Sequence, residues 1–354
     1  MISVFEHEWL GGLFGDDEVT TLWSSRAQLG HFKAFEIALA QALEAAHRVP
    51  ESVGAAASRA IEDASLDIGE LKHRTGIDGL PVPELVRQLR ARAGEAAEAV
   101  HTGATSQDVM DTALSLTLRA LTALYSTRLT RVHSALERLE GAFGVRDLMG
   151  RTRMQAALPI TAANRIAAWR SPIVQHLNRV EELRLRVARL QLGGAVGTAH
   201  VFGEDRDDIA RHMAKQLGLK HDPTWHTDRS AVIEFAGQIS AITGSLGKIG
   251  QDIALMAQQG VDEIVISGGG GSSAMPHKSN PVLAELLVTL ARFNATQVSG
   301  MHQALVHEQE RSGAAWMLEW MILPQMTAAT GRALSTCSTL LDQIGSMGRF
   351  DPEK

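Results

Sequence analysis

Hydrophobic residues recur at alternating spacings of three and four along three long stretches in the middle of the chain. The clearest stretch follows Asp228, a residue type that favours helix N-termini. Its apolar positions are Val232, Phe235, Ile239, Ile242, Leu246, Ile249, Ile253 and Met256. A second stripe follows Asp111, over residues 114–139, and a third covers residues 166–190. The sustained heptad-like spacing predicts three long helices in an extended antiparallel bundle.

Two local features add detail to the prediction of these helices. Several glycines and serines lie between the apolar positions of the first stripe, including Gly247 and Gly250. Because an interior glycine costs about 1 kcal/mol relative to alanine in a helix, we expect other helices to pack closely against it. Pro172 falls inside the third stripe and predicts a kink or an early break there.

The rest of the chain is predicted to be helical as well. Shorter helices are expected over residues 24–47, 51–64 and 84–94, and longer ones over 282–303 and 316–341. Residues 261–267 contain a short apolar run that suggests an extended segment, but no region shows strong strand alternation. We therefore expect an all-α fold with an N-terminal helical domain (1–110), a central long-helix domain (111–345) and a short tail (346–354).

Composition narrows the class of protein. The net charge of −6 argues against a general affinity for nucleic acid or for an anionic membrane surface. No apolar run is long enough for a transmembrane helix, and the N-terminus lacks the features of a signal peptide. Cys337 is the only cysteine, so no intrachain disulfide can form. These features favour a cytoplasmic protein.

Three polar segments interrupt the helical pattern, at residues 101–112, 150–159 and 268–281. All three are dense in hydrogen-bonding side chains, and each lies beside a long predicted helix. A bundle could therefore bring them together although they are distant in sequence.

The third segment carries the strongest chemical signal. Four consecutive glycines, typical of a lid or hinge, precede Ser272, Ser273, Lys278 and Asn280. Hydroxyl, ammonium and amide groups suit an anionic substrate. The segment is not a Walker A phosphate loop, because His277 rather than glycine precedes Lys278. The sequence also lacks H-E-x-x-H, Cys/His clusters and G-x-S-x-G, so neither a metal, another cofactor nor a serine hydrolase triad is predicted.

At these segments the chain resembles the fumarase/aspartase superfamily. Its signature, Gly-Ser-Ser-x-Met-Pro-x-Lys-x-Asn-Pro, is matched at every defined position from Gly271 to Pro281. The resemblance implies an all-α, L-aspartase-like fold with a long central bundle. It also implies a homotetramer in which each active site takes segments from three subunits. Compared with the family, the C-terminal domain is expected to be reduced or absent.

The resemblance also implies a chemistry. Members transfer a proton at the carbon next to a carboxylate through an aci-carboxylate intermediate, without a cofactor. The matching positions make Ser272 the catalytic base and make Lys278 and Asn280 binders of substrate and intermediate. Substrate-binding residues are expected from all three segments and from two further positions. They are His101, Thr105, Ser106, Arg151, Thr152, Arg153, Gln155, Arg229, Ser273, Met275 and Arg311.

Two features indicate the branch of the family. Arg153 stands where C–N lyases acting on adenylosuccinate carry a catalytic histidine, and residues 307–320 resemble the carboxymuconate cycloisomerase branch. That branch forms a lactone from a small-molecule tricarboxylate, whose charges Arg151, Arg153, Arg229 and Arg311 could balance. The alternatives are an adenylosuccinate-type C–N lyase, a sulfomuconate cycloisomerase and a non-catalytic structural relative.

Overall fold

A computed structural model describes residues 3–271, 275 and 279–348, and it confirms the all-α prediction. The α-helices are α1 (Gly11–Phe14), α2 (Asp17–Trp23), α3 (Ser25–Ala45), α4 (Val53–Asp63), α5 (Ile68–Asp78), α6 (Val82–Ala93), α7 (Ser106–Phe143), α8 (Ala162–Val187), α9 (Arg206–Leu217), α10 (Ser230–Met256), α11 (Val282–Gln303) and α12 (Ala314–Asp342). Two 3₁₀ helices, η1 (Gly94–Ala99) and η2 (His200–Asp205), accompany them. The strands are β1 (Asp147–Thr152), β2 (Gln155–Thr161), β3 (Ile264–Ile266) and β4 (Ile344–Met347).

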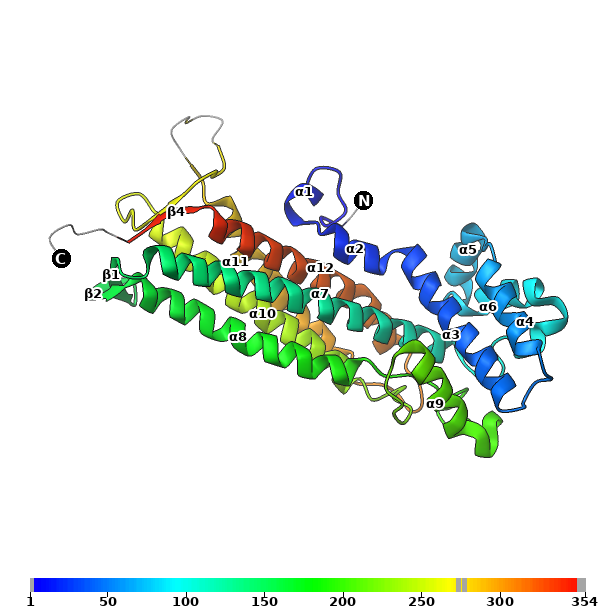
Figure 1. Cartoon of the computed structure of the whole chain (residues 1–354). Helices are drawn as coiled ribbons and strands as arrows, with labels where there is room; N and C mark the ends of the chain where they lie inside the picture. The colour runs from blue at the N-terminus through cyan, green and yellow to red at the C-terminus, as the bar shows by residue number, and fades with distance from the viewer. Residues whose placement is uncertain (1–2, 272–274, 276–278, 349–354) are drawn as a thin grey trace.

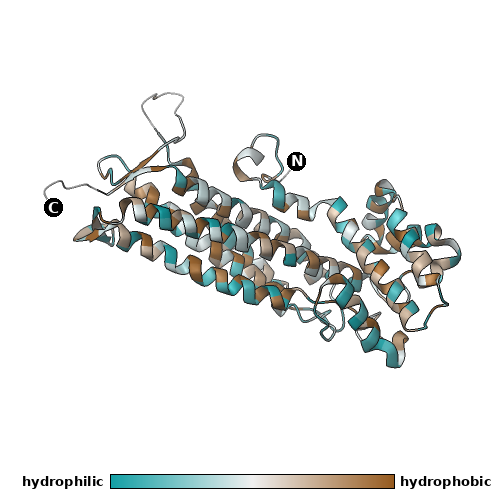
Figure 2. Ribbon diagram, viewed as in Figure 1, coloured by the Kyte–Doolittle hydropathy of each residue, from teal (hydrophilic) through white to brown (hydrophobic). Residues whose placement is uncertain are grey.

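Helices α7, α8, α10, α11 and α12 run side by side and form a long bundle (Figure 1). Hydrophobic positions recur along the whole length of these helices, as Figure 2 shows. The predicted stripe of α10, from Val232 to Met256, is buried in one core with the stripes of α7 and α8. The period of three and four therefore predicted the bundle correctly.

The glycines of α10 serve the expected close packing. A Cβ atom on Gly250 would lie 2.5 Å from the carbonyl oxygen of Ala284 and 2.8 Å from the Cβ of Leu287, both on α11. Only a residue without a side chain allows this approach. The small residues of the stripe thus let α10 and α11 pack closely.

Two helices extend further than their apolar stripes indicated. Helix α7 begins at Ser106, before Asp111, which the stripe follows, because the Thr105 N–H donates to the Asp108 carboxylate (3.0 Å) and so begins the helix there. Of the kink or early break expected at Pro172, the break is absent, since α8 continues to Val187. Trp169 and Ile173, on either side of the proline, are buried in the bundle core, and this packing outweighs the lost backbone hydrogen bond.

The β1–β2 hairpin was not predicted from the sequence. The strands pair antiparallel, with Thr152 opposite Gln155, so the turn contains only Arg153 and Met154. Both turn residues have positive φ values, 49° and 67°. Most of the hairpin is exposed, so it carries no buried-face alternation that could have revealed it. The expected extended segment before the glycine loop was correct and contains β3.

A buried histidine between α8 and α10 gives a test of the bundle interior. The amide of Gln238 donates to His176 Nδ1 (3.0 Å), and Nε2 lies 2.9 Å from the Ser245 hydroxyl, a pattern that requires the neutral imidazole. Burial, together with the charge of Arg179, lowers the pKa of His176 to about 4. The protonated ring is therefore disfavoured in the folded state.

We expect the folded state to lose stability as pH falls from about 6.5, where an unfolded histidine titrates, toward 4. The unfolded chain binds this proton first, so the loss amounts to about 3 kcal/mol and is complete below the folded pKa. Urea unfolding of wild type and His176→Leu at pH 8 and pH 4.5 measures it. The difference in free energy of unfolding between the two proteins should change in favour of the variant at pH 4.5. A constant gap would contradict the prediction, and the exposed His212→Leu serves as control.

The bundle has two distinct ends. Helices α3 to α6 and α9 gather at one end, whereas β1–β2, β4 and the described ends of the segment between β3 and α11 lie at the other (Figure 1). Helix α7 connects the two ends over a length of ten turns or so, roughly 55–60 Å for a helix of this size. Among the described helices, none is both long and apolar enough to cross a membrane.

Candidate active site

The first polar segment is held firmly at the N-terminal end of α7. The His101 backbone N–H donates to Glu36 (2.9 Å), and its ring Nδ1 lies 2.6 Å from the same carboxylate. Glu36 is fully buried on α3, whereas the His101 side chain remains 14% exposed. The imidazole is therefore oriented by Glu36 and still reaches the surface. His101 also has a positive φ of 59°, which marks a tightly constrained backbone.

Thr105 and Ser106 lie at the start of α7 and are half-buried. The helix start is fixed by Asp108, which is fully buried and accepts hydrogen bonds from the backbone N–H groups of Gly193 (2.7 Å) and Gly194 (2.9 Å). His226 Nε2 lies 2.9 Å from the same carboxylate. Asp108 thus ties the first segment to two loops, and sequence reasoning did not single it out.

Arg311 lies at this same end and is held by uncharged groups. Its Nε donates to Gln107 Oε1 (3.0 Å) and its terminal nitrogen donates to the Ala195 carbonyl (3.0 Å). Among the described residues, no carboxylate forms an ion pair with it. A guanidinium that is positioned by neutral acceptors keeps its full charge for an anionic ligand. The geometry suits the predicted substrate-binding role of Arg311.

Arg229 was predicted to bind substrate, and the structure contradicts this. Its side chain is fully buried and donates to both oxygens of Asp111 (2.7 and 3.0 Å) and of Glu319 (2.8 and 2.6 Å). Burial opposes its charge, but the two carboxylates together raise its pKa. Arg229 also stacks on the Trp225 ring at 4.9 Å. The sequence showed a possible cation but not the two acids that accept four hydrogen bonds from it.

The second segment forms the hairpin at the opposite end of the bundle. Arg151 on β1 donates to the buried Glu263 (2.7 Å), so part of its charge is already balanced. Thr152, Arg153 and Gln155 are exposed around the turn. The left-handed conformation of Arg153 costs about 1–2 kcal/mol for an ordinary residue. Such strain is typical of segments whose geometry serves a ligand.

A groove beside the hairpin carries an excess of positive charge. It has a volume of about 410 Å³, and its cationic lining residues are Arg151, Arg153, Arg165 and Lys248. Only Asp252 and Glu263 oppose them among the described lining residues, and Asp252 is paired with Lys248. Sequence reasoning missed Arg165 and Lys248, because they lie on the bundle helices α8 and α10 rather than in a polar segment. The groove can receive an anion.

The third segment begins and ends at this same end of the molecule. Gly270 and Asn280 exchange both backbone hydrogen bonds (2.9 and 2.8 Å), which closes the loop between them. A Cβ on Gly269 would overlap Ser279 Oγ, so the closure requires glycine there. Met275 is 43% exposed. Ser272, Ser273 and Lys278, with the predicted lid or hinge, lie outside the described residues.

The three segments do not meet within one chain. The second segment and the described residues of the third lie at the hairpin end, and the first lies with Arg311 at the other end of α7 (Figure 1). The expectation that a bundle brings all three together is therefore wrong for a single chain. A site that uses all three must combine opposite ends of the bundle from different copies.

The comparisons with known proteins identify the class. A family described as lyase matches residues 16–300, so the chain belongs to this lyase family and is an enzyme of the fumarase/aspartase superfamily. It is 36% identical to the 3-carboxy-cis,cis-muconate cycloisomerase of Acinetobacter baylyi over 332 residues, 91% of this chain and 74% of that protein. The enzyme of the same name from Pseudomonas aeruginosa is 37% identical, over 91% of this chain and 72% of that protein.

A solved structure agrees with these sequence relatives. The 3-carboxy-cis,cis-muconate lactonizing enzyme from Pseudomonas putida superposes with a TM-score of 0.90 at 33% identity, covering 96% of this chain and 77% of that chain. The family resemblance seen in the signature loop and the fold that it implied are both confirmed.

Proposed function

We propose that this protein is a 3-carboxy-cis,cis-muconate cycloisomerase, which converts 3-carboxy-cis,cis-muconate to 4-carboxymuconolactone in the degradation of protocatechuate. The observation that carries the proposal is Arg153 at the exposed tip of the hairpin, above a groove with further cations. A tricarboxylate requires such cations, and an arginine there replaces the histidine expected of a C–N lyase. The names of the similar proteins support the same reaction.

The reaction requires little from the protein beyond charge and one proton. A carboxylate oxygen of the substrate attacks the alkene carbon that is β to a second carboxylate, and the π electrons move onto that carboxylate. The resulting aci-carboxylate then takes a proton at its α carbon. The substrate trianion and one proton from solvent thus give the lactone dianion. Since the attacking group is part of the substrate, no separate acid is needed for an amine leaving group.

In this proposal Ser272 transfers the proton at the α carbon. A serine hydroxyl needs neighbouring donors or a cation to act in proton transfer, and Lys278 and Asn280 supply them while they stabilise the aci-carboxylate. The arginines at both ends bind the remaining carboxylates. His101, Thr105, Ser106, Thr152, Gln155, Ser273 and Met275 complete the predicted contacts with substrate.

A homotetramer with shared active sites is part of the proposal, and so is a cytoplasmic location. The separation of the two ends along α7 supports the assembly, because only a second copy can bring a hairpin end to a first segment. The single cysteine, Cys337, is buried and unpaired, which suits a reducing compartment.

Purified protein with 3-carboxymuconate tests the reaction. We expect loss of the absorbance of the conjugated diene, with 4-carboxymuconolactone as the product identified by NMR. Adenylosuccinate in a parallel reaction should release no fumarate. Retention of the diene at high enzyme concentration would overturn the proposal, and fumarate release would indicate the C–N lyase instead. 3-Sulfomuconate in a third reaction measures the preference between carboxylate and sulfonate.

Arg311→Met is expected to raise the KM for 3-carboxymuconate about 30- to 100-fold, since a charge-assisted hydrogen bond contributes about 2–3 kcal/mol. Arg332→Met is a matched control. Arg332 lies on α12 and is also held by backbone carbonyls, those of Leu13 (2.7 Å) and Gly12 (3.1 Å). Steady-state kinetics should show a normal KM for the control. Equal effects of the two variants would contradict a substrate-binding role for Arg311.

A further inference from the structure

The structure leaves fewer arginines for a tricarboxylate than the sequence predicted. Arg229 is bonded to two buried acids, and the charge of Arg151 is partly balanced by Glu263. Arg153 and Arg311 remain, since neither forms an ion pair with a described carboxylate. Three substrate carboxylates need further positive charge, so a cation that the sequence did not reveal is expected near the groove beside the hairpin.

Arg165 fits this requirement. It lies in the first turn of α8, lines the groove and is half-buried. Other arginines of the same helix, Arg170, Arg184 and Arg186, each pair with a glutamate. Arg165 forms neither an ion pair nor a hydrogen bond with any residue that the structure describes. A charged group that is partly removed from water without a partner is costly, so an anionic ligand is the natural partner of this guanidinium.

The other charges of the groove leave its positive excess at two arginines. Both acids in its wall are already paired, one with Lys248 and the other with Arg151. Among the described lining residues, Arg153 and Arg165 are then the cations that no acid balances. Arg153 lies at the exposed tip of a two-residue turn, whereas Arg165 lies on a helix whose start is fixed by a capping box at Thr161. A group on a helix is held more precisely than one on a turn.

The rest of the lining suits a carbon skeleton. Met154, Leu255, Met256 and Val261 contribute apolar side chains to the groove, whose volume is about 410 Å³. Apolar contacts on the chain and cations on its carboxylates are the combination that a small unsaturated polyacid requires.

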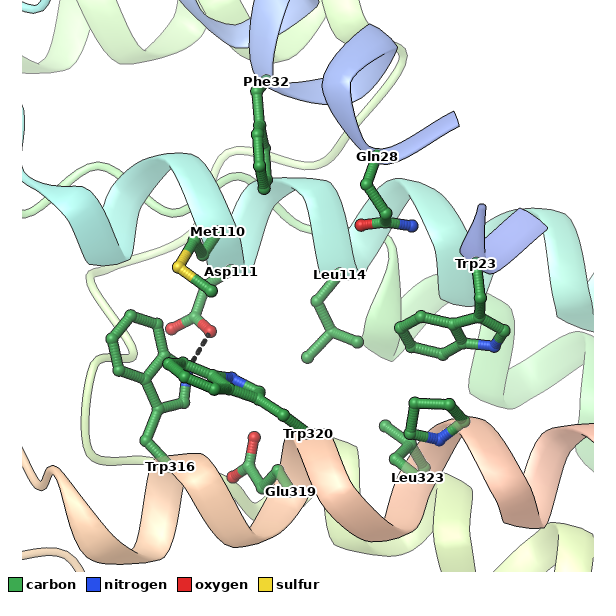
Figure 3. A pocket seen from close by; sticks show the side chains of 11 residues that line it. Trp23, Gln28, Phe32, Met110, Asp111, Leu114, Trp316, Glu319, Trp320 and Leu323 are labelled. Carbon is green, nitrogen blue, oxygen red and sulfur yellow. Dashed lines mark hydrogen bonds between the residues drawn. The ribbon is translucent and has the colours of Figure 1, made fainter. Parts of the chain in front are cut away.

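The pocket between α2, α3, α7 and α12 offers no alternative place for a carboxylate. Its volume is about 230 Å³, and Trp23, Trp316 and Trp320 contribute to its walls (Figure 3). Asp111 and Glu319 are the charged groups among its described lining residues, which include no cation. An anionic group would be repelled there. The carboxylates of the substrate must therefore be bound elsewhere.

The three carboxylates of 3-carboxymuconate have different tasks in the proposed reaction. One attacks the alkene carbon, and a second becomes the aci-carboxylate. The third, on carbon 3, takes no part in bond making and distinguishes this substrate from cis,cis-muconate. A group that does not react is bound equally well in the ground state and in the transition state. A cation in a fixed position is all that it needs.

We propose that Arg165 is the specificity-determining residue that binds this third carboxylate and so selects 3-carboxymuconate over muconates with two carboxylates. Its guanidinium can donate to both oxygens of a carboxylate. This role of Arg165 rests on the proposed function for the reaction, and it goes further by naming the residue that recognises the group which does not react. Because that group is bound equally throughout the reaction, Arg165 acts on KM rather than on kcat.

Steady-state kinetics with two substrates test the role of Arg165. Arg165→Met should raise the KM for 3-carboxymuconate about 30-fold and leave kcat within about twofold of wild type. Any turnover of cis,cis-muconate, which lacks the third carboxylate, should be equal in the variant and in wild type, whereas a general structural defect would lower both activities. Arg170→Met is the matched control, because Arg170 lies on the same helix, pairs with Glu140 and is absent from the groove. Its KM for 3-carboxymuconate should be normal.

Binding of unreactive acids measures the same selectivity without turnover. Tricarballylate is glutarate with a carboxylate added at carbon 3, so the two ligands differ by the group that Arg165 recognises. Isothermal titration calorimetry of wild type should give a Kd for tricarballylate about tenfold lower than for glutarate. Arg165→Met should remove this preference, and Arg170→Met should keep it. Arg165→Gln, which also removes the charge, provides the test if the methionine variant does not fold.

The role of Arg165 and the proposed function fail separately. Equal affinity of wild type for tricarballylate and glutarate would overturn the role of Arg165, and so would an unchanged preference in folded Arg165→Met. A preference that depends on Arg165, in a protein that does not turn over 3-carboxymuconate, would sink the proposed function and leave the binding role. Turnover of 3-carboxymuconate with a normal KM in Arg165→Met would sink the binding role and leave the function.

Discussion

Ser272→Ala should lower kcat with 3-carboxymuconate by about 10³-fold while the protein stays folded and assembled. A positioned group that transfers a proton in the transition state contributes about 10²–10⁴-fold to the rate, and alanine offers no group for this role. The substrate carboxylates are bound by other residues, so KM should change much less than kcat. Steady-state kinetics, with circular dichroism and size-exclusion chromatography as fold checks, measure the effect.

Ser279→Ala is the matched control, because it removes a hydroxyl from the same loop at a position that the family signature leaves undefined. Its kcat should stay within about twofold of wild type, since it removes no proton-transfer group. A Ser272→Ala variant with near-normal kcat would remove this serine from the mechanism. A similar loss in both variants would show that the loop, rather than the Ser272 hydroxyl, is being disturbed.

Arg229→Met should lower the free energy of unfolding by about 3–5 kcal/mol, the usual cost of removing one partner from a buried ion pair. Two carboxylates, Asp111 and Glu319, then remain buried without their cation. Burial raises the pKa of Asp111 even in the intact cluster. Although burial also opposes ionisation of Glu319, Arg229 keeps its pKa below the ordinary value. Urea unfolding at pH 7 measures the loss.

A control variant and a rescue variant distinguish the loss of charge at Arg229 from the loss of its packing. Arg189 stacks on the same Trp225 ring (4.7 Å), but its ionic partner Asp228 is exposed and 3.9 Å away. Arg189→Met should therefore cost about 1 kcal/mol or less. Adding Asp111→Asn and Glu319→Gln to Arg229→Met should recover part of the stability, because no uncompensated charge remains. A loss below about 1 kcal/mol in Arg229→Met would contradict the buried cluster.

The bundle could be predicted from the sequence because its signal is local. Apolar residues at spacings of three and four must face one side of a helix, and α7, α8 and α10 bury those stripes. The hairpin could not be predicted in this way, since its mostly exposed strands bury no alternating face. Its turn also uses Arg153 and Met154 rather than the asparagine and glycine that usually mark such turns.

The candidate site was predictable only in part, for a different reason. The signature loop specifies chemistry by residue identity, so it could be found without a structure. The role of an arginine depends on what surrounds it in three dimensions. Arg311 meets neutral oxygens, whereas Arg229 meets two buried acids that are distant in sequence. Similarly, only the length of α7 reveals that the first segment is far from the other two.

We propose that lactone formation requires both ends of the bundle, contributed by different copies of the chain. Ser272→Ala changes the segment whose described ends lie at the hairpin end, and Arg311→Met changes the opposite end. Each variant alone should be nearly inactive at low 3-carboxymuconate concentration. Unfolding and refolding the two together should restore up to about a quarter of wild-type activity, because random assembly gives that share of sites with both intact residues. A mixture that forms mixed oligomers yet stays as inactive as its parents would contradict the account.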